Sequence, residues 1–212
     1  MLNLDSPWKI VALVATIALL RVIYTVWKTA LARAFLLELF DSGLIAFALV
    51  FFLVRPFVVQ AFYIPSPSME PTLKVYDRIL VNKFIYRLGE PRRKDIAVFR
   101  APEQAMTAGH QKDGQKDYIK RIVGLSGDVL EIRKYEGVFV NGRRLDEPYI
   151  GPDQVPNYDW GPYKVPDGRV FVLGDNRNDS NDSHLWGFLD RQRILGKAMV
   201  IFWPIARISL AR

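Results

Sequence analysis

Two apolar runs without a charged residue, 10–20 and 43–54, lie in the first quarter of the 212-residue chain. A helix crosses a bilayer with about 20 apolar residues, so each run can span only if flanking polar side chains reach the interface. Extended in this way, the second run predicts a span over 36–54. The first extends over 8–27 but contains Arg21, and the sequence leaves open whether it crosses. The chain therefore divides into an N-terminal membrane-anchor region and a C-terminal domain.

A cleavable leader is the alternative for the first run, because Ala30-Leu31-Ala32 has a small-x-small pattern. Only Lys9 precedes the run, however, and Arg21 and Lys28 interrupt the space before the cut, so uncleaved spans fit better. Positive charge between the two runs favours a cytoplasmic loop there. The C-terminal domain is then expected on the opposite side of the membrane.

From residue 57 onward, short runs rich in Val, Ile, Phe and Tyr alternate with Gly, Pro and Asn-Gly pairs, a pattern typical of strands and turns. Asn141-Gly142 predicts a two-residue hairpin. Further strands are predicted over 57–64, 78–82, 95–99, 118–123, 129–133, 169–173 and 197–203. The expected fold is mainly β: an antiparallel sheet or barrel in 64–212 that follows an anchor region, 1–63, whose last part, 57–63, is a membrane-proximal strand.

Composition narrows the chemistry. The absence of cysteine excludes disulfides, zinc–thiolate sites, iron–sulfur clusters and cysteine nucleophiles. With only two histidines, His110 and His184, a three-histidine metal centre is impossible, and neither a metal nor an organic cofactor is expected. Lys and Arg exceed Asp and Glu by 29 to 22, but the one tight basic cluster is 92–94, so nucleic acid is not an expected partner.

Two serines, Ser66 and Ser68, lie among three prolines in 64–73. Proline fixes its own φ and restricts the residue before it, so this segment follows a stiff, non-helical path that can place a hydroxyl in advance. Taken alone, the segment is better explained as a linker that leaves the membrane.

Two further segments carry reactive or polar side chains. Lys120 and Arg121 are adjacent in an apolar strand pattern, so one of the two cations must point to the less watery side. A polar loop, 174–184, follows another predicted strand. Each has an ordinary explanation by itself, a lysine that reaches solvent at a strand edge and a solvated turn. Their order along one chain is the specific signal.

In this order the segments resemble those of bacterial type I signal peptidases, the membrane-anchored Ser/Lys endopeptidases that remove signal peptides from exported proteins. The resemblance covers residues 36–204. It is carried by 65–73, 95–99, Tyr118-Ile119-Lys120-Arg121 with Gly124, Gly127 and Asp128, Val140-Asn141-Gly142, and Gly174-Asp175-Asn176-Arg177 with Ser180, Asp182 and Trp186-Gly187-Phe188.

The resemblance implies that Ser68 is the nucleophile and Lys120 the general base. A serine hydroxyl needs a base as it attacks the scissile carbonyl. A lysine has an ordinary pKa of about 10.4, so it can act as that base only where burial favours the neutral amine. Lowering the pKa to about 8 corresponds to roughly 3 kcal/mol. Arginine cannot replace this base, because it is not deprotonated in proteins.

Other residues are implied to surround this pair. Ser180 would orient the lysine by a hydrogen bond, and Ser66 would join the Ser68 backbone N–H as an oxyanion hole. Tyr118 would lie beside a groove where an extended substrate adds as a strand. Small residues, commonly Ala, are expected one and three positions before the cut. The charged residues implied to brace the polar loop are Asp175, Arg177 and Asp182.

Two positions depart from the family pattern. Pro67 stands where glycine is usual, and since proline has no N–H and a fixed φ, the oxyanion role of Ser66 is left open. His184 stands where many members carry arginine. An ion pair from His184 to Asp175 or Asp182 would depend on pH.

Three alternative functions fit the sequence less well. A Ser-His-Asp hydrolase is disfavoured because His184 and Asp182 are two apart on one loop and no Gly-x-Ser-x-Gly motif is present. A self-cleaving repressor with a Ser/Lys dyad is disfavoured by the apolar start and the lack of a helix-turn-helix signal. The third, a non-catalytic peptide-binding membrane protein on the same fold, is opposed by the joint presence of Ser68, Lys120 and Ser180.

The sequence thus predicts a membrane-bound serine endopeptidase that cuts signal peptides through an acyl-enzyme intermediate. The expected location is the bacterial plasma (inner) membrane, with the catalytic domain on the extracytoplasmic side. Signal-peptide-bearing preproteins and the lipid bilayer are the expected partners. The sequence does not show that Ser68 and Lys120, 52 positions apart, meet in space.

Overall fold

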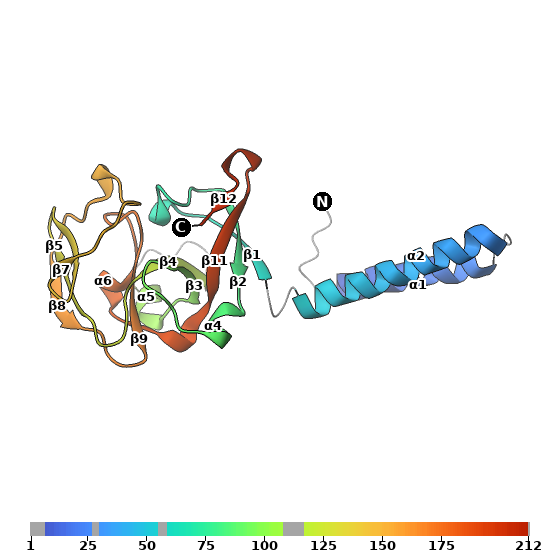
Figure 1. The fold of residues 1–212 in the computed structure, drawn as a ribbon, viewed down its shortest axis with the longest axis horizontal. Helices are drawn as coiled ribbons and strands as arrows, with labels where there is room; N and C mark the ends of the chain where they lie inside the picture. The colour runs from blue at the N-terminus through green and yellow to red at the C-terminus, as the bar shows by residue number, and fades with distance from the viewer. Residues whose placement is uncertain (1–6, 27–29, 55–58, 108–116, 212) are drawn as a thin grey trace. The chain divides into compact units, whose positions relative to one another are not determined.

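The computed structural model describes residues 7–26, 30–54, 59–107 and 117–211 (Figure 1). The chain forms two compact units, Met1–Pro56 and Phe57–Arg212. Strand β1 (Val59–Tyr63) belongs to the second unit because it pairs along its length with β2 (Arg78–Asn82). The compact units thus divide before this strand, and the assignment of residues 1–63 to a membrane-anchor region stays a prediction.

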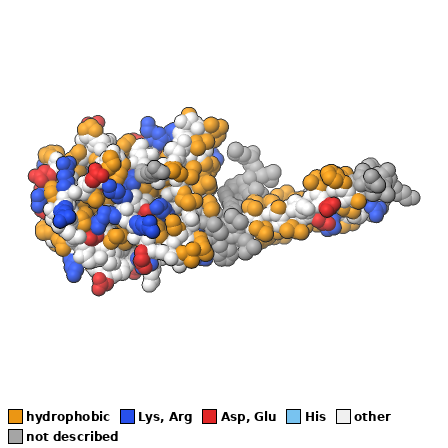
Figure 2. Space-filling view, in the orientation of Figure 1, with side chains coloured by type: hydrophobic (Ala, Val, Ile, Leu, Met, Phe, Trp, Pro, Cys, Tyr) orange, Lys and Arg blue, Asp and Glu red, His pale blue; other side chains and the backbone are white. Residues whose placement is uncertain are grey.

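The first unit consists of two helices, α1 (Pro7–Val26) and α2 (Ala30–Leu49), and α2 is followed by a π-helical turn, η1 (Val50–Val54). Figure 2 shows apolar side chains over much of the visible face of these helices, and Leu19 and Ile45 are 61% and 66% exposed. Apolar surface of this extent is normally covered by lipid or a partner. The segment Arg33–Phe52, with a mean hydropathy of 2.1, is long and apolar enough to cross a membrane, whereas the apolar segment of α1, Val11–Thr25, is shorter.

Arg21, the charge inside the first apolar run, has a partner on the other helix. Its Nη2 lies 2.9 Å from Oδ2 of Asp41 on α2. A charged side chain in an apolar environment is tolerated better when it is paired. The pair gives α1 and α2 a polar contact within mainly apolar helices, and whether α1 crosses the membrane stays a prediction.

The second unit is built from two antiparallel sheets. The larger has the strand order β1–β2–β11–β3–β4–β9–β10, with β12 paired to β11, and the smaller has the order β7–β6–β5–β8. The remaining strands are β3 (Ile96–Arg100), β4 (Asp117–Gly124), β5 (Val129–Arg133), β6 (Gly137–Val140), β7 (Arg143–Arg144), β8 (Trp160–Lys164), β9 (Arg169–Leu173), β10 (Leu189–Asp190), β11 (Ile194–Trp203) and β12 (Ser209–Leu210). The predicted fold class, mainly β and antiparallel, is confirmed.

Helical segments in the second unit are short. They are α4 (Ile85–Leu88), α5 (Glu103–Thr107), α6 (Ser183–Trp186), and the 3₁₀ turns η2 (Pro67–Met69), η3 (Pro152–Gln154), η4 (Arg191–Arg193) and η5 (Ile205–Arg207). The segment 100–116 is polar, a composition typical of a loop; α5 lies in its described part, and 108–116 falls outside the described residues. The helical segments described in this unit have at most five residues.

The Asn-Gly hairpin is confirmed. Asn141 and Gly142 have φ values of +52° and +76° and join β6 to β7, with Val140 opposite Arg143. Positive φ at both central residues is the type I′ geometry, whose twist matches that of the flanking strands. Asparagine and glycine adopt this geometry at the lowest cost.

Strand β8 was missed because Pro162 lies within it. Proline cannot donate to a sheet ladder, so it lowers the strand signal, but it is tolerated at a sheet edge. β8 is such an edge strand, since it pairs with β5 on one side only in the described sheet. The pairs of residues that form β10 and β12 are too short to give a pattern.

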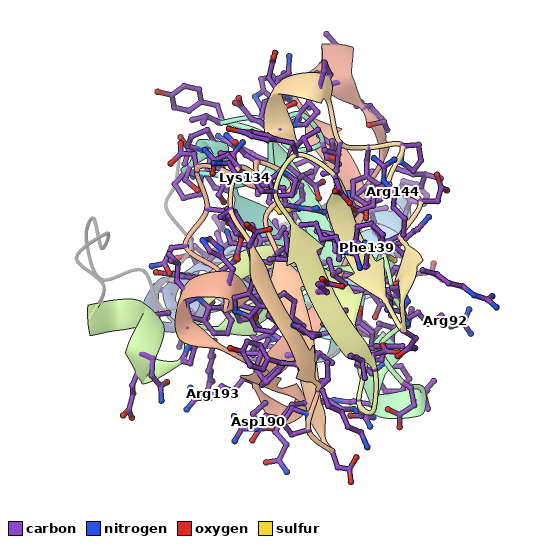
Figure 3. The ribbon with its side chains drawn as sticks, turned by 90° about the vertical axis from the view of Figure 1, so that its left-hand side faces the viewer. Arg92, Lys134, Phe139, Arg144, Asp190 and Arg193 are labelled. Atoms are coloured by element: carbon purple, nitrogen blue, oxygen red, sulfur yellow. The ribbon has the colours of Figure 1, made fainter. Side chains whose placement is uncertain are left out.

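The smaller sheet shows the period of two that its sequence predicts. On β6, Val138 and Val140 are buried, whereas Phe139 between them is half-buried on the other face. Figure 3 labels Phe139 on this sheet, with Lys134 and Arg144 at the exposed surface nearby. The guanidinium of Arg133 lies 4.1 Å from the Phe139 ring. The outer face is therefore covered by cationic side chains and the inner face packs the core.

Burial fixes the serine-bearing segment to the larger sheet. Met69 and Leu73 have no exposed surface and pack in one core cluster with Ile79, Val81 and Ile96. Full burial of such a side chain contributes about 1.5–3 kcal/mol. The residues just after Ser68 therefore anchor it against the sheet that contains β4.

Candidate active site

A short 3₁₀ turn, η2, presents the serine. It begins at Pro67, whose fixed φ suits the first helical position. Ser68 is 7% exposed, and its Oγ lies 3.3 Å from Oγ of Ser66. The turn is also fastened from the polar loop, where the backbone N–H of Asn176 donates to the Ser68 carbonyl at 3.2 Å. The backbone of Ser68 is thus held by the polar loop, and its hydroxyl lies beside that of Ser66.

Strand β4 brings Lys120 to this hydroxyl. Lys120 Nζ lies 2.7 Å from Ser68 Oγ, and only 4% of the lysine is exposed. The two groups, which the sequence could not show to meet, are therefore in hydrogen-bond contact. They border a cavity of about 180 Å³ that is lined by Pro65, Ser66, Pro67, Ser68, Tyr118, Ile119, Lys120, Asp179 and Asn181.

Burial of Lys120 lowers its pKa to about 8. Removal from water disfavours the ammonium form, and the carboxylates of Asp182, Asp175 and Asp179 oppose this effect by attracting the charge. Loss of solvation is the larger effect. Near neutral pH a usable fraction of the amine is therefore neutral and can accept a proton from Ser68 Oγ.

Tyr118 lies at the same cavity, two residues before Lys120 on the same strand. Its ring centroid is 5.7 Å from Lys120 Nζ, and burial raises the pKa of its hydroxyl. The tyrosine is therefore a neutral wall of the cavity at physiological pH.

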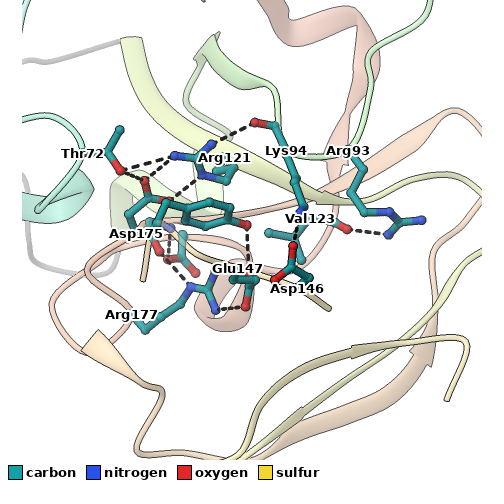
Figure 4. A network of polar contacts seen from close by, with 12 residues as sticks. Thr72, Arg93, Lys94, Arg121, Val123, Asp146, Glu147, Asp175 and Arg177 are labelled. Carbon is teal, nitrogen blue, oxygen red and sulfur yellow. Dashed lines mark hydrogen bonds and ion pairs between the residues drawn. The ribbon is translucent and has the colours of Figure 1, made fainter. Parts of the chain in front are cut away.

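The neighbouring Arg121 lies on the opposite face of β4 (Figure 4). Its Nε and Nη2 donate to the two carboxylate oxygens of Asp175 at 2.8 and 2.6 Å, and Nη1 donates to the Lys94 carbonyl at 2.9 Å. The Thr72 hydroxyl donates to Asp175 at 2.5 Å. This fork-to-fork ion pair ties the segment that follows Ser68 to the start of the polar loop.

A second buried ion pair extends the network. The Arg177 guanidinium donates to both carboxylate oxygens of Glu147 at 3.0 and 2.5 Å, and its Nε donates to the Gly174 carbonyl at 3.1 Å. Tyr149 joins the two pairs, because its hydroxyl donates to Glu147 and its ring lies 3.7 Å from the Arg121 guanidinium. Asp175 and Arg177 thus brace the loop by contacts on the far side from Lys120.

The remaining carboxylate of the loop, Asp182, caps helix α6. Its side chain accepts from the backbone N–H of Gly174 at 2.8 Å and from Nδ1 of His184 at 2.7 Å. The His184 ring stacks on Tyr158 with centroids 4.3 Å apart. The histidine therefore pairs with Asp182 and not with Asp175, and it is not among the residues that line the Ser68 cavity in the described chain.

Ser180 does not make the expected hydrogen bond. Its Oγ is buried and has no hydrogen-bond partner among the described residues, and Lys120 Nζ donates to Ser68 Oγ instead. The hydroxyl lies against Gly174, where a Cβ would collide with Ser180 Oγ and with the Ser68 carbonyl. Whether Ser180 orients the lysine during the reaction stays a prediction.

Several residues of the site carried no individual sequence signal. Gly174 leaves room for Ser180 and the Ser68 carbonyl because it has no side chain. Asn176 contacts the nucleophile turn through its backbone and its amide. Thr72 bonds to Asp175 and Glu147 to Arg177, and both partners are far along the chain. A glycine at the start of a polar loop was the only available hint. In the described part of the chain no cluster of three His, Asp or Glu side chains could hold a metal ion.

Comparison with known proteins matches this arrangement. The family model described as signal peptidase, peptidase S26, matches residues 36–203, which include the serine turn, β4 and the polar loop. The chain belongs to the peptidase S26 signal peptidase family. This membership makes it a serine endopeptidase of the signal peptidase I type, and the removal of signal peptides is the activity of the family.

Named relatives agree with the family assignment. The probable signal peptidase I-2 of Synechocystis sp. is 51% identical over 158 residues, which cover 74% of this chain and 69% of that protein. The signal peptidase I P of Bacillus subtilis subsp. natto is 36% identical over 178 residues, covering 80% and 90% respectively. A solved signal peptidase I from Enterococcus faecalis V583 matches with a TM-score of 0.41 at 28% identity, over 51% of this chain and 97% of its own. That score is too low to add to the comparison of folds.

Proposed function

We propose that this signal peptidase cleaves signal-peptide-bearing preproteins with Ser68 as the nucleophile and Lys120 as the general base. The observation that carries this proposal is the 2.7 Å contact between Lys120 Nζ and Ser68 Oγ at a cavity open to substrate. Burial lowers the pKa of the lysine to about 8, so the base is available without a histidine.

The first half of the reaction forms an acyl-enzyme. Neutral Lys120 takes the hydroxyl proton as Ser68 Oγ attacks the scissile carbonyl. The tetrahedral intermediate collapses with cleavage of the C–N bond, and the Lys120 ammonium gives its proton to the leaving amine. The mature protein leaves with a new N-terminus, while the signal peptide stays bound to Ser68 as an ester.

The second half returns the enzyme to its starting state. Lys120, neutral again, takes a proton from a water molecule as that water attacks the ester carbonyl. Ser68 Oγ then leaves and regains its proton from Lys120, and the signal peptide is released as a carboxylic acid, which loses its remaining proton to water. No metal or organic cofactor takes part in any of these steps.

The oxyanion of both intermediates needs donors. Ser66 Oγ lies near the nucleophile, 3.3 Å from Ser68 Oγ, and the backbone N–H of Ser68 is the second donor that we assign. Pro67 has no N–H to contribute, but its carbonyl accepts from the Asn176 side chain at 3.4 Å. The proline thus helps to hold the turn while Ser66 supplies the hydroxyl.

Substrate is proposed to bind as an extended strand beside Tyr118, with small residues of the Ala-x-Ala type before the cut. Anchoring by α2, and by α1 if it crosses, places the enzyme in the bacterial plasma membrane, with the catalytic unit on the extracytoplasmic side. This arrangement would bring the cavity to preproteins whose apolar segments lie in the same bilayer.

Cleavage of a purified preprotein by the detergent-solubilised full chain tests the proposal. Ser68→Ala and Lys120→Ala are expected to be inactive, and His184→Ala is expected to keep activity, with mass spectrometry of the product N-terminus as the readout. Loss of activity in His184→Ala with retention in Lys120→Ala would make the base assignment wrong. If the wild type itself does not cut good signal sequences, the chain is a peptide-binding relative and not a protease.

A further inference from the structure

Only one carboxylate borders the Ser68 cavity in the described structure, and it belongs to Asp179. Asp179 is exposed. Its backbone N–H donates to the Asn176 carbonyl at 3.1 Å, and this hydrogen bond closes a turn in the polar loop. The carboxylate itself has no hydrogen bond or ion pair with any described residue. A free acidic side chain therefore stands at the wall of the cavity that receives the substrate.

The other two carboxylates that act on Lys120 are unavailable to substrate. Asp175 and Asp182 have no exposed surface. Asp175 is committed to Arg121, and Asp182 to the Gly174 N–H and His184. Among these three described carboxylates, only that of Asp179 both raises the pKa of Lys120 and borders the cavity without a partner.

We propose that Asp179 is a specificity-determining residue that favours preproteins carrying a lysine or arginine next to the scissile bond. This inference rests on the proposed function and adds to it a preference for one class of substrate. A substrate cation in the cavity gains an unpaired carboxylate as a partner, whereas an acidic side chain there is repelled.

The position of the cation in the substrate is restricted. Small side chains are expected one and three residues before the cut, so those positions are taken. The cation would therefore be the second residue before the cut, or the first or second residue after it. Side chains of an extended chain alternate between two faces, so the second residue before the cut and the first after it point one way and the second after it points the other way.

The same contact would act on the base. Asp179 favours the charged form of Lys120, together with Asp182 and Asp175, while burial favours the uncharged form. A substrate cation that pairs with Asp179 offsets part of its negative field. Such a substrate would increase the fraction of Lys120 that is ready to accept the Ser68 proton.

Matched peptide substrates test this preference with the full chain in detergent. A neutral parent peptide carries glutamine at the three positions, and in each variant one glutamine is replaced by lysine or by glutamate. For wild type we expect kcat/KM to be about two- to fivefold higher with lysine than with glutamine at one of these positions, and lower with glutamate. The preference should weaken at 1 M salt, where exposed charges are screened.

Three variants separate the role of the carboxylate from a general effect. Asp179→Asn should abolish the lysine preference, Asp179→Glu should keep it, and Asp167→Asn, which changes an exposed carboxylate in a different cavity wall, should behave as wild type. With the neutral peptide, Asp179→Asn should also move the acid limb of kcat/KM to lower pH, because a charge that raises the pKa of Lys120 is gone.

The outcomes are distinguishable. Failure of wild type to cleave the neutral parent peptide contradicts the proposed function. Cleavage of the parent without any lysine preference, or a preference that survives in Asp179→Asn, contradicts only the role of Asp179. A preference lost equally in Asp179→Glu and Asp167→Asn would also overturn it, since the effect would then not depend on a carboxylate at this position.

Discussion

The two faces of strand β4 carry two adjacent, buried cationic residues that have different partners. Lys120 is 4% exposed and Arg121 is 1% exposed. Arg121 forms a bidentate ion pair with a carboxylate and makes further hydrogen bonds. Lys120 contacts a neutral hydroxyl, and the carboxylates that affect its pKa act on it without a direct hydrogen bond or ion pair in the described structure.

This difference separates a structural group from a reactive one. A buried cation with a full set of partners keeps its charge and joins distant segments, as Arg121 joins β4 to Asp175 and Thr72. A buried cation without a direct counterion has a weaker preference for the charged form, as the lowered pKa of Lys120 shows. Burial is shared by both residues, so the type of cation and its partners together decide which chemistry follows.

Lys120→Arg breaks the comparison most completely, because both faces would then carry a permanent cation. We expect a loss of cleavage as large as in Lys120→Ala, on the order of 10⁴-fold or more, since arginine cannot accept the Ser68 proton. Initial rates of peptide cleavage measure this, with circular dichroism to check that the variant is folded. Cleavage within tenfold of wild type would show that Lys120 is not the base.

Arg121→Met removes the cation from the structural face and leaves Asp175 buried without its partner. We expect a loss of about 3–5 kcal/mol in unfolding free energy, the usual effect of breaking a buried pair. Urea unfolding of the full chain in detergent, followed by tryptophan fluorescence, measures it.

A double variant, Arg121→Met with Asp175→Leu, is the control for this loss, because replacement of both partners should recover much of the stability. Arg133→Met, at an exposed pair with Glu131, should leave the unfolding midpoint unchanged. Equal midpoints for Arg121→Met and wild type would show that the buried pair does not hold the loop.

The pH dependence of wild-type cleavage tests the comparison of Lys120 with Arg121 further, and its expected effect is smaller than those of the variants. The neutral form of Lys120 is the active one and its pKa is lowered to about 8. As pH falls below about 8, kcat/KM should decrease about tenfold per unit, because each unit removes nine-tenths of the neutral amine. A pH series with a neutral peptide measures this, and an acid limb near the ordinary lysine pKa of about 10.4 would contradict the role of burial.

Local patterns in the sequence predicted much of the catalytic unit. The strands over 78–82, 129–133 and 169–173 end where predicted, and the Asn141-Gly142 hairpin has the expected geometry, because these signals depend on neighbouring residues. Pro162 concealed β8, since a proline lowers the strand signal whether or not the strand lies at an edge.

The site residues divide in the same way. Alternation along a strand places Lys120 and Arg121 on opposite faces. It does not say which face holds Asp175 or which loop carboxylate receives His184, and these contacts span 54 and two positions respectively. Gly174 belongs to a segment that carries the resemblance, but the sequence does not show its role, which is to leave space for Ser180 and the Ser68 carbonyl beside it.

The sequence by itself therefore determined the apolar helices, most strands, the hairpin and, through resemblance, the identity of the nucleophile and base. Only the tertiary structure decided that Ser68 Oγ and Lys120 Nζ come within 2.7 Å, and that among the described residues Ser180 Oγ has no hydrogen-bond partner and Asp179 borders the cavity unpaired. The physical reason is that secondary structure follows from short-range preferences, whereas burial and ion pairing depend on strands and loops brought together from distant parts of the chain.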